Sequence, residues 1–77
     1  MTVKVYSTPV CPWCHRAKEY LKEKGIKFED INVAENREAA SEMIEKSGQM
    51  GVPVLDINGD IVVGFDKERI DRALRRK

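Results

Sequence analysis

The sequence has little of several features that define large classes of proteins. No apolar run approaches the roughly 20 residues that a membrane-spanning helix needs, and the first ten residues lack the basic start and long apolar segment of a signal peptide. Its 14 basic and 13 acidic residues leave a net charge of only +1, without the strong basic excess typical of nucleic-acid-binding proteins. We therefore expect a cytoplasmic protein that binds neither membranes nor nucleic acid.

Cysteine is equally scarce, because Cys11 and Cys14 are the only two in the chain. A disulfide between them would close a loop too short to stabilise the fold much through chain entropy. The 77 residues suffice for a single domain, residues 1–77, with a small core. In a cytoplasmic protein of this kind a close cysteine pair is usually catalytic or metal-binding.

Hydrophobic spacing and turn residues predict the order β-α-β-α-β-β-α. The first β-α-β unit should pair its strands in parallel, and Asn58-Gly59 between two β-rich runs is typical of an antiparallel hairpin. The predicted class is α/β, with a mixed sheet of about four strands flanked by helices. The predicted strands cover residues 2–6, 29–33, 53–57 and 61–63, and the predicted helices cover residues 11–24 and 37–47 and follow Asp66.

The second and third helices also have predicted caps and buried faces. Asn36 should cap the second helix and Gly48 should end it, while Asp66 should cap the third. Three polar residues of the first helix and the basic C-terminus, at a helix end, are predicted to lie in solvent. The second helix should bury Ala40, Met43, Ile44 and Ser47, the third Ile70, Ala73 and Leu74; the solvated groups are His15, Arg16, Lys18, Arg75, Arg76 and Lys77.

The string C-x-x-C-H is compatible with a dithiol, half of a metal site or a haem attachment. Haem needs a large apolar pocket and export, yet strands are predicted where a small cytochrome would have helices, and Met43 and Met50 are better explained by core or loop packing. A structural zinc site needs about four ligands, which Cys11, Cys14 and His15 do not supply. We predict no metal site within one chain.

The dithiol interpretation needs only the residues that are present. Cys11 lies where a loop becomes a helix, so unpaired amides and the helix dipole favour a negative sulfur and a nucleophilic role. Cys14 follows one turn later and can close a disulfide that releases a reduced partner. Trp13 should lie at the rim, covering the sulfur or contacting a substrate. A buried, inert pair remains the alternative.

Two further motifs, "GVPV" and "GFD", follow the cysteines. Pro53 begins a predicted strand, and a cis bond before it would expose the Val52 backbone for pairing with a peptide or glutathione. Gly64, Phe65 and Asp66 precede a helix N-terminus, which forms either an anion site or a simple cap.

Together, "CPWCHRAKEYL", "GVPV" and "GFD" closely resemble the glutaredoxins over essentially the whole chain. The sequence is most similar to short bacterial and archaeal glutaredoxin-like proteins of the YruB type, and also to the small electron donors of ribonucleotide reductase. The resemblance implies a thioredoxin fold and a cis bond before Pro53. It also implies a thiol–disulfide oxidoreductase of protein or small-molecule disulfides, in which Cys11 is the nucleophile and Cys14 resolves the intermediate.

For members that use glutathione, the resemblance implies that backbone atoms of Val52 hold its cysteinyl part and that the 64–66 turn receives its γ-glutamyl end. Three positions depart from the family pattern, since Thr8 replaces a common lysine, Gly51 a threonine and Trp13 a tyrosine. The electron source is therefore either glutathione, as a co-substrate, or a thioredoxin reductase, as in the ribonucleotide reductase donors.

We expect a monomer without a tightly bound cofactor. Two alternatives remain at this point. One is a carrier that binds an iron–sulfur cluster between two chains through Cys11 and a glutathione thiol. The other is a redox-linked binding module without turnover.

Overall fold

The computed structural model describes residues 2–75, which form four strands and three helices in the predicted order. The observed bounds lie within one residue of the predicted ones. They are β1 (Val3–Ser7), α1 (Pro12–Glu23), β2 (Glu29–Asn32), α2 (Arg37–Ser47), β3 (Val54–Ile57), β4 (Asp60–Val63) and α3 (Lys67–Arg75).

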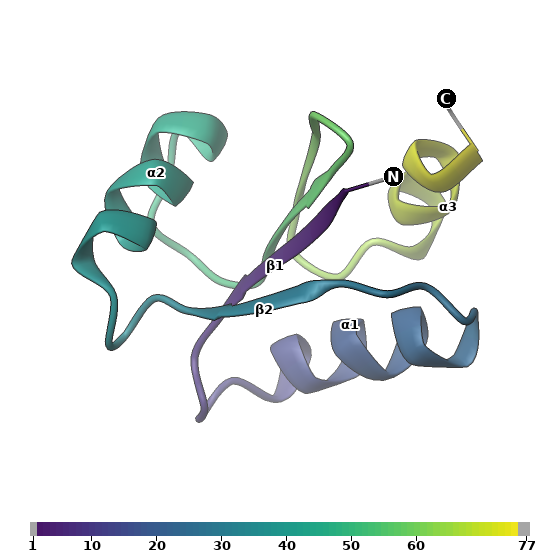
Figure 1. Cartoon of the computed structure of the whole chain (residues 1–77), viewed down its shortest axis with the longest axis horizontal. Coiled ribbons are helices and arrows are strands. Elements are labelled where there is room, and N and C mark those ends of the chain that lie inside the picture. Colours follow the sequence, from purple (N-terminus) through teal and green to yellow (C-terminus); the bar gives the residue numbers. More distant parts are fainter. Residues whose placement is uncertain (1, 76–77) are drawn as a thin grey trace.

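The strands form one mixed sheet in the order β2-β1-β3-β4 (Figure 1). β1 and β2 are parallel, as the predicted β-α-β unit requires, while β3 is antiparallel to both β1 and β4. In the hairpin, Asn58 has φ 54° and Gly59 has φ 96°, the two positive values that a type I′ turn needs. This is the thioredoxin fold, which confirms the fold class that the resemblance implies.

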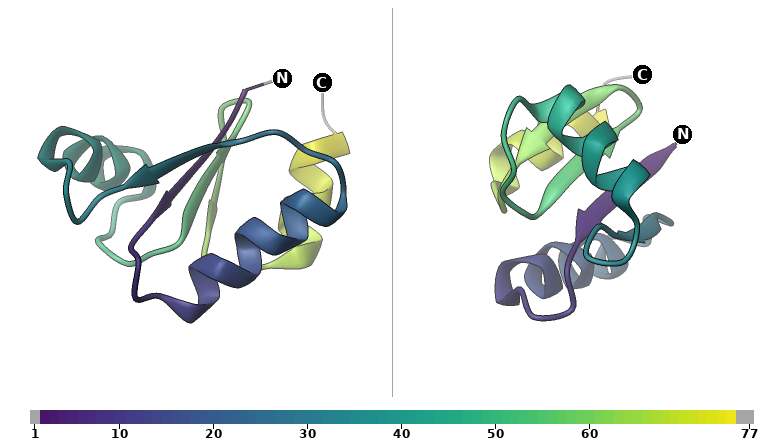
Figure 2. Two further views of the ribbon diagram at one scale, coloured as in Figure 1. Left: turned by 60° about the horizontal axis from the view of Figure 1, so that its bottom comes forward. Right: turned by 90° about the vertical axis from the view of Figure 1, so that its left-hand side faces the viewer.

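Helices cover both faces of the sheet, with α1 and α3 on one side and α2 on the other (Figure 2). Consecutive residues of β1, such as Val5 and Tyr6, are therefore both fully buried but on opposite faces. Apolar residues near β2 also divide between the two faces. Phe28 packs against the cluster on the side of α1 and α3, and Ile31 packs against the cluster on the side of α2. The first cluster includes Val3, Val5, Ala17, Leu21, Leu55, Ile57, Val62, Ile70 and Ala73, and the second Tyr6, Ala39, Met43 and Val54.

The buried face of α2 differs from the predicted one. Met43 is buried as expected, but its partner is Ala39, whereas Ala40 is half-buried and Ile44 is 38% exposed. The helix is rotated so that Ala39 and Met43 pack on the sheet, while the neighbouring Lys46 side chain donates hydrogen bonds to the Tyr6 hydroxyl at 3.0 Å and to Asp56 at 2.7 Å. Its ends are as predicted, since the Asn36 side chain accepts a hydrogen bond from the Ala39 N–H and Gly48 closes the helix with φ 75°.

The last helix also agrees with expectation, because Ile70 and Ala73 are buried and Phe65 packs against the same cluster. Arg75 is exposed in its final turn, while Arg76 and Lys77 lie outside the described residues. Within residues 2–75, no helix combines the length and apolar character needed to cross a bilayer.

Candidate active site

Cys11 occupies the N-cap position of α1, directly after the loop that leaves β1. Its backbone is extended, with φ −96° and ψ 110°, and its Sγ accepts a hydrogen bond from the Cys14 N–H at 3.2 Å. Pro12 follows in the first turn, where its missing N–H removes no helical hydrogen bond. The sulfur therefore lies at the positive end of α1, the position that the sequence predicts for it.

The two cysteines have different environments, although both are free thiols. Cys11 is partly exposed, whereas Cys14 is fully buried. Burial, together with the contact from Cys11, raises the pKa of Cys14 to about 11. Nowhere in residues 2–75 do three or more His, Cys, Asp or Glu side chains gather in a way that could hold a metal ion. At neutral pH the accessible sulfur is thus Cys11, with a protonated thiol directly behind it.

The "GVPV" segment lies directly beside the cysteines. The Cys11 thiol is 3.9 Å from the Val52 carbonyl oxygen, to which it can donate, although the two residues are 41 positions apart. The Val52–Pro53 bond is cis, as the resemblance implies. The Pro53 carbonyl in turn accepts a hydrogen bond from the Gly64 N–H at 2.8 Å. The fold thereby brings three separate sequence motifs to one end of α1.

The 64–66 turn contacts this site through Phe65 rather than through its acidic residue. The Phe65 ring lies 6.4 Å from the Trp13 ring and 5.8 Å from that of Tyr20. An Asp66 carboxylate oxygen accepts a hydrogen bond from the Arg69 N–H at 3.2 Å. The sequence left open whether this turn forms an anion site or a helix cap. In the structure, the Asp66 carboxylate caps α3.

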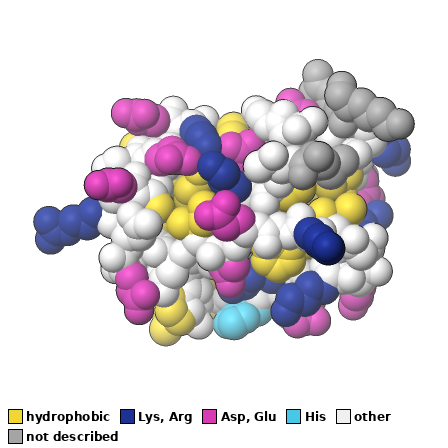
Figure 3. All heavy atoms as spheres, in the orientation of Figure 1, with side chains coloured by type: hydrophobic (Ala, Val, Ile, Leu, Met, Phe, Trp, Pro, Cys, Tyr) yellow, Lys and Arg dark blue, Asp and Glu magenta, His cyan; other side chains and the backbone are white. Residues whose placement is uncertain are grey.

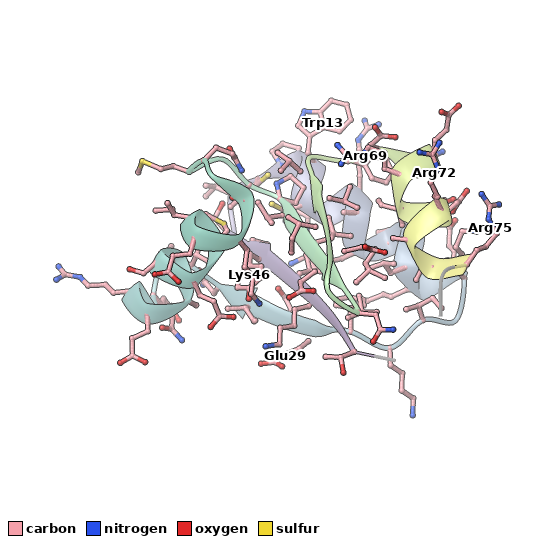
Figure 4. All side chains as sticks on the ribbon, turned by 90° about the horizontal axis from the view of Figure 1, so that it is seen from above. Trp13, Glu29, Lys46, Arg69, Arg72 and Arg75 are labelled. Carbon is pink, nitrogen blue, oxygen red and sulfur yellow. The ribbon has the colours of Figure 1, made fainter. Side chains whose placement is uncertain are left out.

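Three exposed apolar residues lie within two positions of Cys11 or Val52 along the chain. Val10 is 88% exposed, Met50 78% and Trp13 55%, and Figure 4 shows Trp13 projecting outward at the edge of the molecule. The Arg16 guanidinium lies 5.0 Å from the centre of the Trp13 ring. The prediction that Met50 packs in a loop or the core is wrong, because this side chain is exposed. Its place in a short segment between Gly48 and Gly51 was the available signal.

Lys18 corrects a second prediction. Its side chain is only 15% exposed, and its Nζ lies 3.0 Å from an Asp30 carboxylate oxygen. The other oxygen of Asp30 accepts a hydrogen bond from the Ser7 hydroxyl at 2.9 Å. Spacing within α1 could not reveal this pair, because its partner comes from β2. Arg16 and His15 are exposed, as predicted.

Comparison with known proteins decides the family, because the family model for glutaredoxin matches residues 3–62. The chain belongs to the glutaredoxin family. It is a thiol–disulfide oxidoreductase of the glutaredoxin type, and membership implies disulfide substrates and redox partners.

Individual glutaredoxin-like proteins agree over most of the chain. An uncharacterized glutaredoxin-like 8.6 kDa protein in the rubredoxin operon of Clostridium pasteurianum is 51% identical, covering 96% of this chain and 99% of that protein. Glutaredoxin 3 of Escherichia coli K12 is 38% identical over 83% of this chain and 77% of its own length. The structure of the glutaredoxin-like NrdH-redoxin of Escherichia coli, described as having a thioredoxin-like activity profile, superimposes with a TM-score of 0.83. The two sequences are 30% identical, and the superposition covers 94% of this chain and 93% of the NrdH-redoxin chain.

Proposed function

We propose that Cys11 and Cys14 form a redox dithiol that reduces disulfides in proteins or small molecules. The Cys11 thiolate attacks a substrate disulfide, forming a mixed disulfide and releasing the first substrate thiol. Cys14 then attacks the Cys11 sulfur, which expels the second thiol and leaves a Cys11–Cys14 disulfide. The observation that carries this assignment is the hydrogen bond from the Cys14 N–H to a partly exposed Cys11 Sγ, with Cys14 itself fully buried.

The surroundings of Cys11 favour an extended polypeptide as the substrate. The Val52 backbone lies beside the sulfur and offers main-chain pairing to a strand-like segment. Exposed apolar surface on Val10, Trp13 and Met50 offers contact to the side chains of such a segment. Small disulfides would use the same sulfur but less of this surface.

For the electron source, we favour a protein such as thioredoxin reductase over glutathione. Thr8 supplies no ammonium for a glutathione carboxylate, and the Asp66 carboxylate is engaged in capping α3. Glutathione remains a co-substrate candidate through Val52, Pro53 and the 64–66 turn. The discriminating experiment offers the oxidised protein either glutathione with its reductase, or NADPH with thioredoxin reductase. Faster recovery of thiols with glutathione would contradict this preference.

The remaining assignments are a cytoplasmic location, a monomer and no tightly bound cofactor. An absorbance spectrum of anaerobically purified protein tests the last of these. We expect no absorption band in the visible range. A brown colour with visible absorption typical of an iron–sulfur cluster would favour the alternative, a carrier with a cluster bound between two chains.

The dithiol mechanism is tested by separate Cys11→Ser and Cys14→Ser variants in an insulin reduction assay. Cys11→Ser should abolish reduction because no exposed nucleophile remains. Cys14→Ser should accumulate the mixed disulfide, visible by mass spectrometry under non-reducing conditions. Full activity of the Cys11→Ser variant would show that the nucleophile is assigned wrongly, and absence of turnover in the parent would favour a binding module.

A further inference from the structure

A cavity of about 290 Å³ is lined by residues from the end of β1, from the loop after it, from α1 and from β2. Its polar lining includes Ser7, His15, Lys18 and Asp30. The mechanism above assigns no role to these groups.

Lys18 is held firmly within this cavity lining. Its Nζ pairs with Asp30 at 3.0 Å, and the Ser7 hydroxyl, which is buried, fixes the other carboxylate oxygen at 2.9 Å. Burial opposes ionisation of Asp30, but the hydrogen bonds from Lys18 and Ser7 outweigh it and lower its pKa below the ordinary value. The cation is therefore anchored near one place instead of moving freely in solvent.

That place is one helical turn from the buried thiol. Cys14 and Lys18 are at i and i+4 on α1, so their side chains lie on the same face of the helix. Burial and the contact with Cys11 raise the pKa of Cys14, and the Lys18 charge has a smaller, lowering effect. The other polar group acting on Cys14 is the Thr8 backbone, while the neighbouring His15 ring is 3.3 Å from the Pro9 carbonyl.

We propose that Lys18, anchored by Asp30, is a positioning residue for the resolving step, stabilising the Cys14 thiolate as it forms. The proposal rests on the dithiol function proposed above. Cys14 releases its proton to water, and its thiolate attacks the Cys11 sulfur of the mixed disulfide. The bond from Cys11 to the substrate sulfur breaks, and the electron pair leaves with the substrate sulfur, which takes a proton from water. The two cysteines are thereby oxidised by two electrons and the substrate is reduced.

The size of the effect follows from two opposing trends. Without the Lys18 charge, less of Cys14 is thiolate at neutral pH. The remaining thiolate is more basic and therefore somewhat more nucleophilic, but this gain is smaller than the loss of thiolate. Lys18→Met should therefore slow the resolving step by about two- to threefold at pH 7. The deficit should shrink as the pH rises and Cys14 ionises in both proteins.

The test mixes the full chain, in excess, with dithiobis(nitrobenzoate) in a stopped-flow instrument at several pH values between 6 and 10. The first coloured thiolate reports the attack by Cys11, and the second reports resolution by Cys14. Lys18→Met and Lys18→Gln should slow the second phase relative to the first at pH 7, and Lys18→Arg should restore it. Lys27→Met, which removes an exposed lysine from the loop between α1 and β2, is the control and should leave the ratio unchanged.

An unchanged ratio in both neutral variants would overturn the proposal. Equal slowing at every pH, or failure of Lys18→Arg to restore the rate, would also overturn it by indicating a purely structural role. If instead the parent releases no second thiolate, the dithiol function itself fails. The two failures are therefore distinguishable in one experiment.

Discussion

At the scale of single residues, the cysteine pair is defined by the difference in exposure between its two sulfurs. Cys11 caps α1 and is partly exposed, whereas Cys14 is completely buried one turn later. The Cys14 N–H, in the first turn of α1, donates to the Cys11 sulfur. One hydrogen bond therefore both caps the helix and fixes the position of the sulfur that we propose as the nucleophile.

The buried Cys14 thiol should make the reduced protein less stable at alkaline pH. Its pKa is raised to about 11, so between pH 9 and 11 the unfolded chain loses a proton that the folded chain keeps. The stability present below pH 9 is thus lost as the pH rises through 11. Urea unfolding of the parent and of Cys14→Ala, at pH 8 and pH 10.5 with reductant, measures the effect.

The comparison between the two proteins is needed because burial also raises the pKa of Tyr6, which acts in the same direction. Tyr6 is present in both proteins, so the additional loss of unfolding free energy in the parent at high pH is due to Cys14. Equal pH dependence in parent and Cys14→Ala would contradict the assigned ionisation.

Trp13 should matter for substrate binding far more than for folding. Trp13 is 55% exposed, and its ring lies 6.4 Å from the Phe65 ring and 5.0 Å from the Arg16 guanidinium. Trp13→Ala should change the free energy of unfolding by less than about 1 kcal/mol. It should raise KM for a protein disulfide about tenfold, the loss expected of an aromatic contact residue.

The control for Trp13 is Ile44→Ala, which removes another exposed apolar side chain from α2 on the opposite face of the sheet. Steady-state insulin reduction should give an unchanged KM for this control. An equal rise in KM for both variants would mean that Trp13 has no special part in substrate contact.

At the scale of secondary-structure elements, α1 holds the site in place through its buried side. Ala17 and Leu21 are fully buried against the sheet and α3. Gly25, with φ 72°, then turns the chain toward β2. The orientation of the helix, and with it that of Cys11, thus depends on apolar contacts two and three turns from the sulfur.

Leu21→Ala should lower the free energy of unfolding by about 2–5 kcal/mol, because it leaves a cavity in the larger cluster. That is a large share of the stability of a domain of this size. Lys22→Ala at the adjacent, exposed position should stay within about 0.5 kcal/mol of the parent. Urea unfolding followed by circular dichroism gives both values, and a Leu21→Ala cost below that of the control would contradict the assigned packing.

Element boundaries were predicted closely because they depend on local chemistry. Asn58-Gly59 adopts the two positive φ values of a tight hairpin, and Asn36 caps α2 through its own side chain. The buried face of α2 was predicted less well. Its choice of Ala39 over Ile44 is set by the surface of the sheet, which spacing within the helix does not describe.

At the scale of the whole molecule, the charges are unevenly distributed despite the small net charge. Acidic side chains gather around α2 and β2, in the left half of Figure 3. The excess of negative charge opposes self-association through this end of the molecule. The acidic side chains of these two elements and the loop between them are Glu29, Asp30, Glu35, Glu38, Glu42 and Glu45.

A monomer should have a radius of gyration near the 11.2 Å of the Cα trace, slightly enlarged by hydration. A compact dimer of this chain would give about 15 Å. Small-angle X-ray scattering over a concentration series, under reducing conditions, separates the two. A value that approaches the larger figure as concentration rises would show that the protein self-associates.

The sequence alone determined the order of the elements, the hairpin turn and the placement of Cys11 at the start of a helix. Each of these depends on backbone preferences and side chains within a few residues of one another. Only the tertiary structure decided that Val52 lies beside Cys11, that Met50 is exposed and that Lys18 pairs with Asp30. The physical reason is that these contacts join segments separated along the chain, whose distances are set by the pairing of the strands and the packing of helices on both faces of the sheet.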